Sequence, residues 1–250
     1  MSDSHQTETI GIVFALEAET RGLKRVLSHS RRVKTRLASQ IAWRFGGVTV
    51  VAEVGGIGRE RCQQTTNRLI DQGARWIACA GFAAALDSIA RAGDVVVAER
   101  VLLPEPDALP IRCSSALMAS IPPSGRLGYT IWRSDMVTWD SMVLRASAKR
   151  DIYRTTGAAA LDMEAHAVGE ACDHRGVPFV VVKGISDTAD EDLPEEMEAL
   201  AVSRRWADRL GLIVRRPMIW PDLWRLRRNT LLASDNLGDV LGTMLLRLFG

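Results

Sequence analysis

The segment "TIGIVFAL", residues 9–16, decides the fold class of this chain. It is a continuous apolar run that contains several β-branched residues, and this pattern is typical of a strand that is covered on both faces. A strand of this kind needs neighbouring strands at its edges and helices above and below. The rest of the chain must therefore supply further strands and the helices that cover them.

Similar runs recur downstream, at residues 48–54, 75–81, 93–103, 158–162 and 179–187. Segments with the apolar spacing of helices separate several of them, near 59–72, 139–155 and 164–175. Gly176 and Pro178 are typical of a chain leaving a helix. Strands that alternate with helices predict an α/β fold. We expect one domain at residues 1–190, with a central mixed β-sheet flanked by helices.

Composition narrows the classes of function. The chain has 250 residues, 47% of them hydrophobic, and a formal net charge of +2, which does not predict a nucleic-acid partner. The four cysteines are scattered, so neither a disulfide framework nor a zinc site is expected, and a reducing cytoplasm fits them. The polar N-terminus does not resemble a signal peptide. No apolar run reaches the ~20 residues that a bilayer-spanning helix needs.

The chain changes character over residues 191–250, where prolines, tryptophans and arginines cluster. We expect a helical C-terminal extension that contains two amphipathic helices, "PDLWRLRRNTLLAS" and "NLGDVLGTMLLRLF". Apolar and arginine-rich sides are also the composition of a helix that lies on a membrane surface. Two alternatives stay open for 217–250: packing on the same domain or a second subunit, and peripheral membrane contact.

Acidic residues and glycine turns follow the predicted strands. In open α/β sheets, ligands bind beyond the carboxyl ends of strands, so these residues are site candidates. Each has a simpler explanation, because "GGIG" at 55–58 can be only a tight turn, and acids after a strand can cap helices. His166 is expected to be a packed or surface histidine. The candidates are Glu17 and Glu19, the 55–58 turn with Gly56, Gly81 with Phe82, the segment Asp162 to Glu164, and Ser186 with Asp187.

Taken together, these motifs resemble the purine and uridine phosphorylase superfamily in its nucleosidase branch. The similar segments are "IGIVFALEAE", "VAEVGGIGRERC", "ACAGFAAALDSIARAGDVVVAE", "LDMEAHAV" and "PFVVVKGISDTAD", and they cover roughly residues 9–190. The branch that looks most similar contains 5′-methylthioadenosine/S-adenosylhomocysteine nucleosidases and hopanoid-associated relatives, which remove adenine from adenosylhopane. The resemblance implies a nucleoside phosphorylase-like fold. Chains of this branch are also expected to end soon after the helix that follows the strand matching residues 179–187.

The resemblance implies a role for each candidate. Glu164 would accept hydrogen bonds from the ribose hydroxyls, since a carboxylate can hold two donors. Asp187 would protonate N7 of a leaving purine, for which its pKa must be raised by burial. Glu19 would activate water. The remaining assignments are Met163 against the sugar, Gly56, Gly81, Phe82 and Ser186 in the substrate site, Lys183 paired with Glu19 or Glu164, Val137 and Thr138 near the base, and Asp162 as a structural acid.

Departures from the phosphorylase pattern favour water over phosphate as the nucleophile. "FALEAE" replaces the expected G-D-P-x-R segment, and Ala78-Cys79 stand where an arginine is expected. Burying a phosphate dianion without arginines would cost several kcal/mol. Phe82 replaces a hydroxyl residue, which leaves room for an altered substrate.

We therefore predict a nucleosidase that hydrolyses an adenine nucleoside, with or without a 5′ substituent such as those of methylthioadenosine or adenosylhopane. We expect it to need no cofactor or metal and to form a homodimer. A phosphate-dependent phosphorylase and a non-catalytic nucleoside-binding protein are the alternatives.

Overall fold

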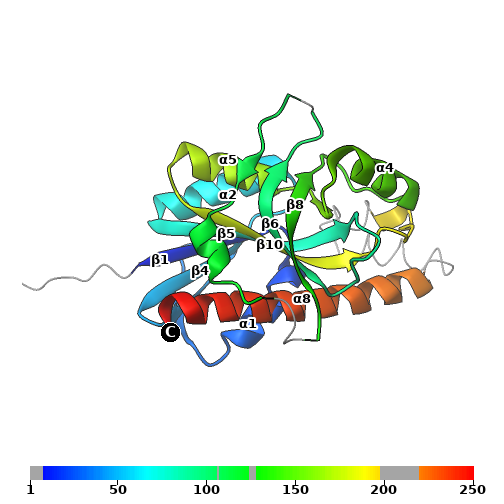
Figure 1. The fold of residues 1–250 in the computed structure, drawn as a ribbon. Helices are drawn as coiled ribbons and strands as arrows, with labels where there is room; N and C mark the ends of the chain where they lie inside the picture. Colours follow the sequence, from blue (N-terminus) through cyan, green and yellow to red (C-terminus); the bar gives the residue numbers. More distant parts are fainter. Residues whose placement is uncertain (1–7, 106, 124–127, 198–219) are drawn as a thin grey trace, which may run out of the picture.

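A ten-stranded mixed sheet lies between two layers of helices in a computed structural model that describes residues 8–105, 107–123, 128–197 and 220–250 (Figure 1). The predicted central mixed sheet is thereby confirmed. The strands are β1 (Thr9–Phe14), β2 (Arg31–Val33), β3 (Gln40–Phe45), β4 (Val48–Val54), β5 (Ala74–Ala85), β6 (Val95–Leu102), β7 (Ile111–Arg112), β8 (Ile131–Thr138), β9 (Ala160–Asp162) and β10 (Phe179–Asp187). The helices are η1 (Glu17–Thr20), α1 (Arg21–Val26), α2 (Arg59–Asp71), α3 (Ser115–Ala119), α4 (Ala146–Thr156), α5 (Ala165–His174) and α8 (Trp220–Phe249).

Strand pairing closes part of the sheet into a ring. β5 pairs with β10 in parallel, β10 with β6 antiparallel, β6 with β8 in parallel, β8 with β9 in parallel, and β9 with β5 antiparallel. β1 joins this ring through a parallel pairing with β5, and β4, β3 and β2 continue the sheet beyond β1. The ends of β1, β5, β9 and β10 consequently come close together, which positions the site described below.

Alternate side chains of β1 enter two different hydrophobic layers. Ile10, Ile12 and Phe14 pack in a cluster with leucines of α1 and α8, whereas Val13 packs in a cluster with residues of α2 and α5. The side-chain period of two along a strand requires such a division. Figure 1 shows α2 and α5 on one face of the sheet, and α1 and α8 on the other. The apolar run at 9–16 therefore forms the doubly covered strand that it predicts.

Several elements differ from the sequence prediction. β2, β3 and β8 were not predicted, and β5 extends to Ala85 instead of ending near residue 81. The helix expected at 139–155 begins only at Ala146. The Asp192 carboxylate accepts a hydrogen bond from the Ala146 amide at 2.7 Å and caps that helix from a distant segment. A local sequence pattern could not reveal a cap of this kind.

The C-terminal segment also differs from its prediction. One helix, α8, spans Trp220–Phe249 where two amphipathic helices were expected. Part of the predicted 191–250 extension, residues 198–219, lies outside the described residues. Within the part of the chain that the structure describes, no helix is long and apolar enough to cross a bilayer.

Candidate active site

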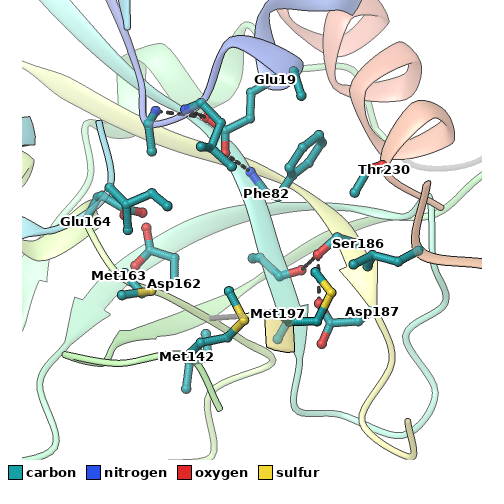
Figure 2. A pocket seen from close by; sticks show the side chains of 18 of the residues that line it. Glu19, Phe82, Met142, Asp162, Met163, Glu164, Ser186, Asp187, Met197 and Thr230 are labelled. Atoms are coloured by element: carbon teal, nitrogen blue, oxygen red, sulfur yellow. Dashed lines mark hydrogen bonds between the residues drawn. The ribbon is translucent and has the colours of Figure 1, made fainter. Parts of the chain in front are cut away.

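A cavity of about 430 Å³ lies where the ends of β1, β5, β9 and β10 meet. Figure 2 shows Glu19, Glu164 and Asp187 around it, each delivered by a different part of the fold. The cavity gathers residues from distant parts of the chain: Glu19 and Asp187 are 168 positions apart. The sequence candidates that line it are Glu17, Glu19, Phe82, Asp162, Met163, Glu164, Ser186 and Asp187.

Glu19 is held by backbone amides. Its Oε2 accepts hydrogen bonds from the amides of Ala15 and Leu16, both at 2.8 Å, and its Oε1 accepts one from the Phe82 amide at 2.9 Å. Burial raises the pKa of Glu19, while the Lys183 charge and these three amides act in the opposite direction. The carboxylate is therefore fixed in place but retains a substantial affinity for a proton, as a general base requires.

Gly81 allows Glu19 to approach β5. A Cβ atom on Gly81 would lie 2.6 Å from Oε1 of Glu19, which is too close for any real contact. Gly81 does not line the cavity, so its predicted contact with the substrate is replaced by a role in positioning Glu19. The Phe82 ring faces the cavity, and the backbone amide of Phe82 donates the hydrogen bond to Glu19. The side chain at position 82 can therefore vary without loss of that hydrogen bond.

Glu164 and Asp162 share a buried lysine. The Lys183 Nζ lies 2.8 Å from Asp162 Oδ2 and 3.8 Å from Glu164 Oε2. Lys183 was predicted to pair with Glu19 or Glu164, and Glu164 is the nearer of these two. Asp162, which was not predicted as a partner, lies nearer still. Lys183 is 1% exposed and does not line the cavity. Its ammonium therefore compensates the carboxylates from inside the protein.

Burial dominates the protonation of Glu164. It raises the pKa of Glu164 to about 7, although the Lys183 charge and a hydrogen bond of 3.0 Å from the Gly58 amide both favour the ionised form. Glu164 thus changes charge close to neutral pH. Asp162, by contrast, accepts hydrogen bonds from the Thr138 hydroxyl and the Ala165 amide, which is the structural role expected of it.

Asp187 ends β10 with both carboxylate oxygens occupied. Oδ1 accepts a hydrogen bond from the Ser186 hydroxyl at 2.7 Å, and Oδ2 accepts one from the Lys149 Nζ at 2.6 Å. Asp187 is 5% exposed and lines the cavity. The sequence did not single out Lys149, because a lone lysine within a helical segment carries no signal of burial.

Like Gly81 and Lys183, the predicted site residues Val137, Thr138 and Gly56 do not line the cavity. Val137 is fully buried among the side chains of a small hydrophobic cluster, and the Thr138 hydroxyl binds Asp162. Both belong to β8, which pairs with β6 and β9 on either side, and both are 0% exposed. In the 55–58 turn, the Gly58 amide binds Glu164 and Ile57 lines the cavity, whereas Gly56 does not.

Apolar side chains that the sequence did not flag form much of the cavity wall. They come from the segment after β8, from the segment after β10, and from α8. They are Met142, Val143, Leu193, Met197, Leu226 and Thr230, of which only Thr230 is polar. Only Met142 and Val143 had a signal in the sequence, since they lie a few residues beyond Val137 and Thr138, which were expected near the base. Which side chain enters the cavity depends on packing.

His166 lies where the sequence analysis expects it. His166 is 4% exposed, with Nδ1 at 3.6 Å from a Glu170 carboxylate oxygen, and burial lowers its pKa. It is a packed histidine, one of the two expected placements. Among the described residues, no cluster of histidine, cysteine and acidic side chains has an arrangement that could hold a metal ion.

Comparisons with known proteins agree with this geometry. A family model described as "Phosphorylase superfamily" matches residues 9–216. A 5′-methylthioadenosine/S-adenosylhomocysteine nucleosidase from an Exiguobacterium strain is 28% identical over 203 residues, which cover 73% of this chain and 86% of the relative. The solved nucleosidase of Colwellia psychrerythraea in complex with adenine is 21% identical, with a TM-score of 0.74, covering 97% of this chain and 96% of the other. Futalosine hydrolase of Helicobacter pylori is 18% identical, with a TM-score of 0.73, covering 96% and 98%.

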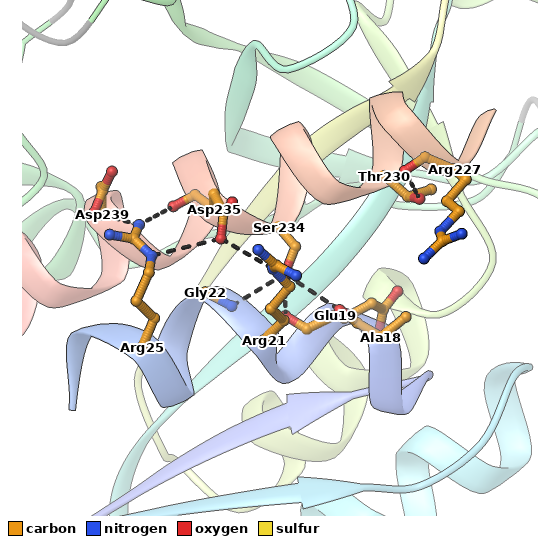
Figure 3. A network of polar contacts seen from close by, with 10 residues as sticks. All are labelled: Ala18, Glu19, Arg21, Gly22, Arg25, Arg227, Thr230, Ser234, Asp235 and Asp239. Carbon is orange, nitrogen blue, oxygen red and sulfur yellow. Dashed lines mark hydrogen bonds and ion pairs between the residues drawn. The ribbon is translucent and has the colours of Figure 1, made fainter. Parts of the chain in front are cut away.

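This coverage corrects the expectation that relatives end soon after the helix that follows the last strand. α8 contains 30 residues, and an alignment that covers 97% of a 250-residue chain must include most of them. The helix therefore belongs to the common fold. Figure 3 shows how it docks: the Ser234 hydroxyl accepts a hydrogen bond from the Gly22 amide, and Arg25 pairs with Asp239 at 2.9 Å.

The apolar side of α8 is largely buried in its own domain. Leu237, Leu241 and Met244 are at most 1% exposed, within the same cluster as the side chains of β1. Near the start of the helix, however, Trp224 is 72% exposed. The predicted amphipathic face therefore divides into a buried part and a shorter exposed part.

Proposed function

The chain belongs to the phosphorylase superfamily, and on this basis we propose that it is a nucleosidase that hydrolyses the N-glycosidic bond of an adenine nucleoside. The observation that carries the proposal is the meeting of Glu19, Glu164 and Asp187 at one cavity. Each carboxylate has its own partners: three amides for Glu19, Gly58 and Lys183 for Glu164, and Ser186 and Lys149 for Asp187. Different surroundings suit different roles in one reaction.

These three carboxylates can divide the reaction among them. Breaking the C1′–N9 bond leaves the bonding electrons on the base and a positive charge on the sugar. Asp187 donates a proton to N7 of the leaving base, and Glu19 takes a proton from water as the water oxygen attacks C1′. Glu164 accepts hydrogen bonds from the 2′ and 3′ hydroxyls. Those carboxylates that are ionised at this stage also favour the positive charge on the sugar.

Water suits this cavity better than phosphate does. Among the described residues that line it, none is arginine or lysine, whereas Glu17, Glu19, Asp162, Glu164 and Asp187 are acidic. A phosphate dianion would have to enter beside several carboxylates without a cation to bind it. Phosphorolysis is therefore the second candidate, and a binding protein without activity is a third, which the intact acids disfavour.

The apolar wall supports a substrate with an apolar 5′ substituent. Met142, Leu193, Met197 and Leu226 line the cavity, and a polar triphosphate or sugar would gain little from them. Several relatives are named for 5′-methylthioadenosine and S-adenosylhomocysteine. We infer an adenine nucleoside whose 5′ group is a thioether or a larger apolar group, as in methylthioadenosine or adenosylhopane.

We further propose that the protein works in the cytoplasm as a homodimer. The exposed tryptophans at the start of α8, Trp220 at 50% and Trp224 at 72%, support contact with a second subunit or with a membrane surface. The two alternatives differ in a simple measurement, since only membrane contact makes the protein sediment with liposomes. Residues 217–219 of the proposed membrane segment lie outside the described residues.

The deciding experiment measures free base and sugar products from adenosine, 5′-methylthioadenosine and uridine, with and without inorganic phosphate. We expect free adenine and free sugar from the adenine nucleosides, at a rate that phosphate does not change. A sugar 1-phosphate as the main product would establish the phosphorylase instead. Binding of these nucleosides without any base release would favour the binding protein.

A further inference from the structure

A buried lysine contacts the proposed acid from outside the cavity. Lys149 of α4 is 0% exposed, and its Nζ donates to Asp187 Oδ2 at 2.6 Å, to the Thr188 carbonyl at 2.8 Å and to the Glu191 carbonyl at 3.1 Å. An ammonium group has three hydrogen-bond donors, so all of them are used. Lys149 does not line the cavity and cannot touch a substrate there.

The other cations near Asp187 already have acidic partners. Arg150, next to Lys149 on α4, lies 3.6 Å from Asp190, and Arg225 of α8 lies 3.2 Å from a Glu191 carboxylate oxygen. Lys183 on β10 pairs with Asp162 and Glu164. Among the described residues, Lys149 is therefore the cation that is hydrogen-bonded to Asp187, while the Glu191 side chain turns to Arg225 and to the Thr188 amide.

This contact affects proton donation in two ways. An ammonium group beside a carboxyl group favours its ionised form. The protonated Asp187 then releases its proton to N7 more readily, because the carboxylate that remains is stabilised. The same effect limits the pH range, since Asp187 is protonated, and able to donate, only below the pH at which its carboxyl group titrates.

We propose that Lys149 is a positioning residue that sets the charge of Asp187 and thereby the upper pH limit of base release. The part of this inference that concerns base release rests on the proposed function. The link between Lys149 and the charge of Asp187 is a property of the free protein. It can therefore be tested even if no substrate is turned over.

The test combines a titration of Asp187 with a pH profile. Protein labelled with ¹³C at the aspartate carboxyl groups is titrated by NMR, and Asp187→Asn identifies the Asp187 resonance by its loss. Lys149→Gln removes the positive charge but keeps two hydrogen-bond donors for the Thr188 and Glu191 carbonyls. Its Asp187 resonance should change at a higher pH than in the wild type, because the adjacent positive charge is gone. Lys149→Arg keeps the charge and should titrate close to the wild type.

The rate of base release gives the second reading. In Lys149→Gln, kcat should fall on the pH plateau by roughly tenfold or more, because a weaker acid gives up its proton more slowly. The alkaline limb of the profile should move to higher pH together with the NMR titration. A merely structural role would lower the rate equally at every pH. Arg225→Gln is the matched control, since it removes a cation near the same segment that has no hydrogen bond to Asp187.

The results of the titration and of the pH profile decide whether Lys149 sets the charge of Asp187. An Asp187 titration that is the same in Lys149→Gln and in the wild type overturns the proposal. A titration that moves while the alkaline limb stays in place also overturns it, because another group then sets that limb. If Lys149→Gln does not fold, Lys149→Met, which fills the same space without a charge, takes its place in the titration. A wild type without base release, but with the expected NMR shift, refutes the proposed function and leaves the charge relation standing.

Discussion

Glu164→Gln should weaken the enzyme and stabilise the protein above neutral pH. Glu164 is 6% exposed, and its surroundings make the ionised carboxylate costly. A pKa of 4.5 in the unfolded chain and about 7 in the folded protein corresponds to about 3 kcal/mol, at ~1.4 kcal/mol per pH unit. Glutamine has the same shape as the protonated side chain and can still accept the Gly58 hydrogen bond, but it is never charged.

The sign of the effect follows from proton binding. Between pH 4.5 and pH 7 the folded state binds more protons at Glu164 than the unfolded state does, so stability falls as the pH rises through this window. The loss is complete above about pH 7. Between pH 5 and pH 8, this group should lower the free energy of unfolding of the wild type by roughly 2–3 kcal/mol, and Glu164→Gln should lack that decrease.

Urea unfolding at pH 5 and pH 8 measures this difference. The quantity to compare is the change in unfolding free energy between the two pH values, because pH-independent effects of the substitution cancel. Burial raises the pKa of Glu19 too, but Glu19 is present in both proteins. Glu17→Gln, at a side chain that is 69% exposed, is the matched control. Parallel pH dependence in the wild type and Glu164→Gln would refute the reasoning, and so would wild-type turnover in the variant.

Three further predictions concern the acid, the base and the C-terminal helix. Asp187→Asn should lower kcat by roughly 10²-fold or more, and initial rates on an adenine nucleoside measure this. It should also lower the melting temperature, because the buried Lys149 ammonium loses its carboxylate partner. Gly81→Ala should displace Glu19, whose oxygen lies 2.6 Å from the added Cβ, and lower kcat more than it changes KM; a full rate would show that Glu19 is not the base. Leu241→Ala should cost about 2–5 kcal/mol of stability, because Leu241 is 0% exposed, while Trp224→Ala should leave stability unchanged; co-sedimentation of both with anionic liposomes tests the membrane alternative separately.

The sequence alone was sufficient to predict the central strands of the sheet and the positions of three carboxylates at their ends. Apolar runs such as 9–16 and 179–187 have a composition that only strands covered on both faces can use, and both are fully internal strands, β1 and β10. The acids Glu19, Glu164 and Asp187 directly follow such strands or end them, and strand ends meet at one edge of a sheet. Their meeting at one cavity was thus predictable from local patterns and strand order.

Packing decided what lies around those acids. Lys149 and Lys183 are both buried lysines. Lys183 lies within the apolar run 179–187 and was predicted to pair with an acid, but nothing in the residues next to Lys149 distinguishes it from a lysine on a surface. Val137 and Thr138 lie on a strand beside the cavity, but Val137 packs in a hydrophobic cluster and the Thr138 hydroxyl binds Asp162. Contacts of this kind join segments far apart in the chain, so no local pattern records them.

The C-terminal helix shows the same division between pattern and packing. Its amphipathic composition is readable from residues 220–249, and the sequence predicted helix there. An apolar helical face is equally suited to a membrane, a second subunit or its own domain, because burial of apolar surface is non-directional. The close approach of Gly22 and Gly238, where an added Cβ on either would collide with the backbone of the other helix, selects the domain itself for much of that face. The sequence by itself therefore determined that the helix needs an apolar partner, and only the tertiary structure decided which one.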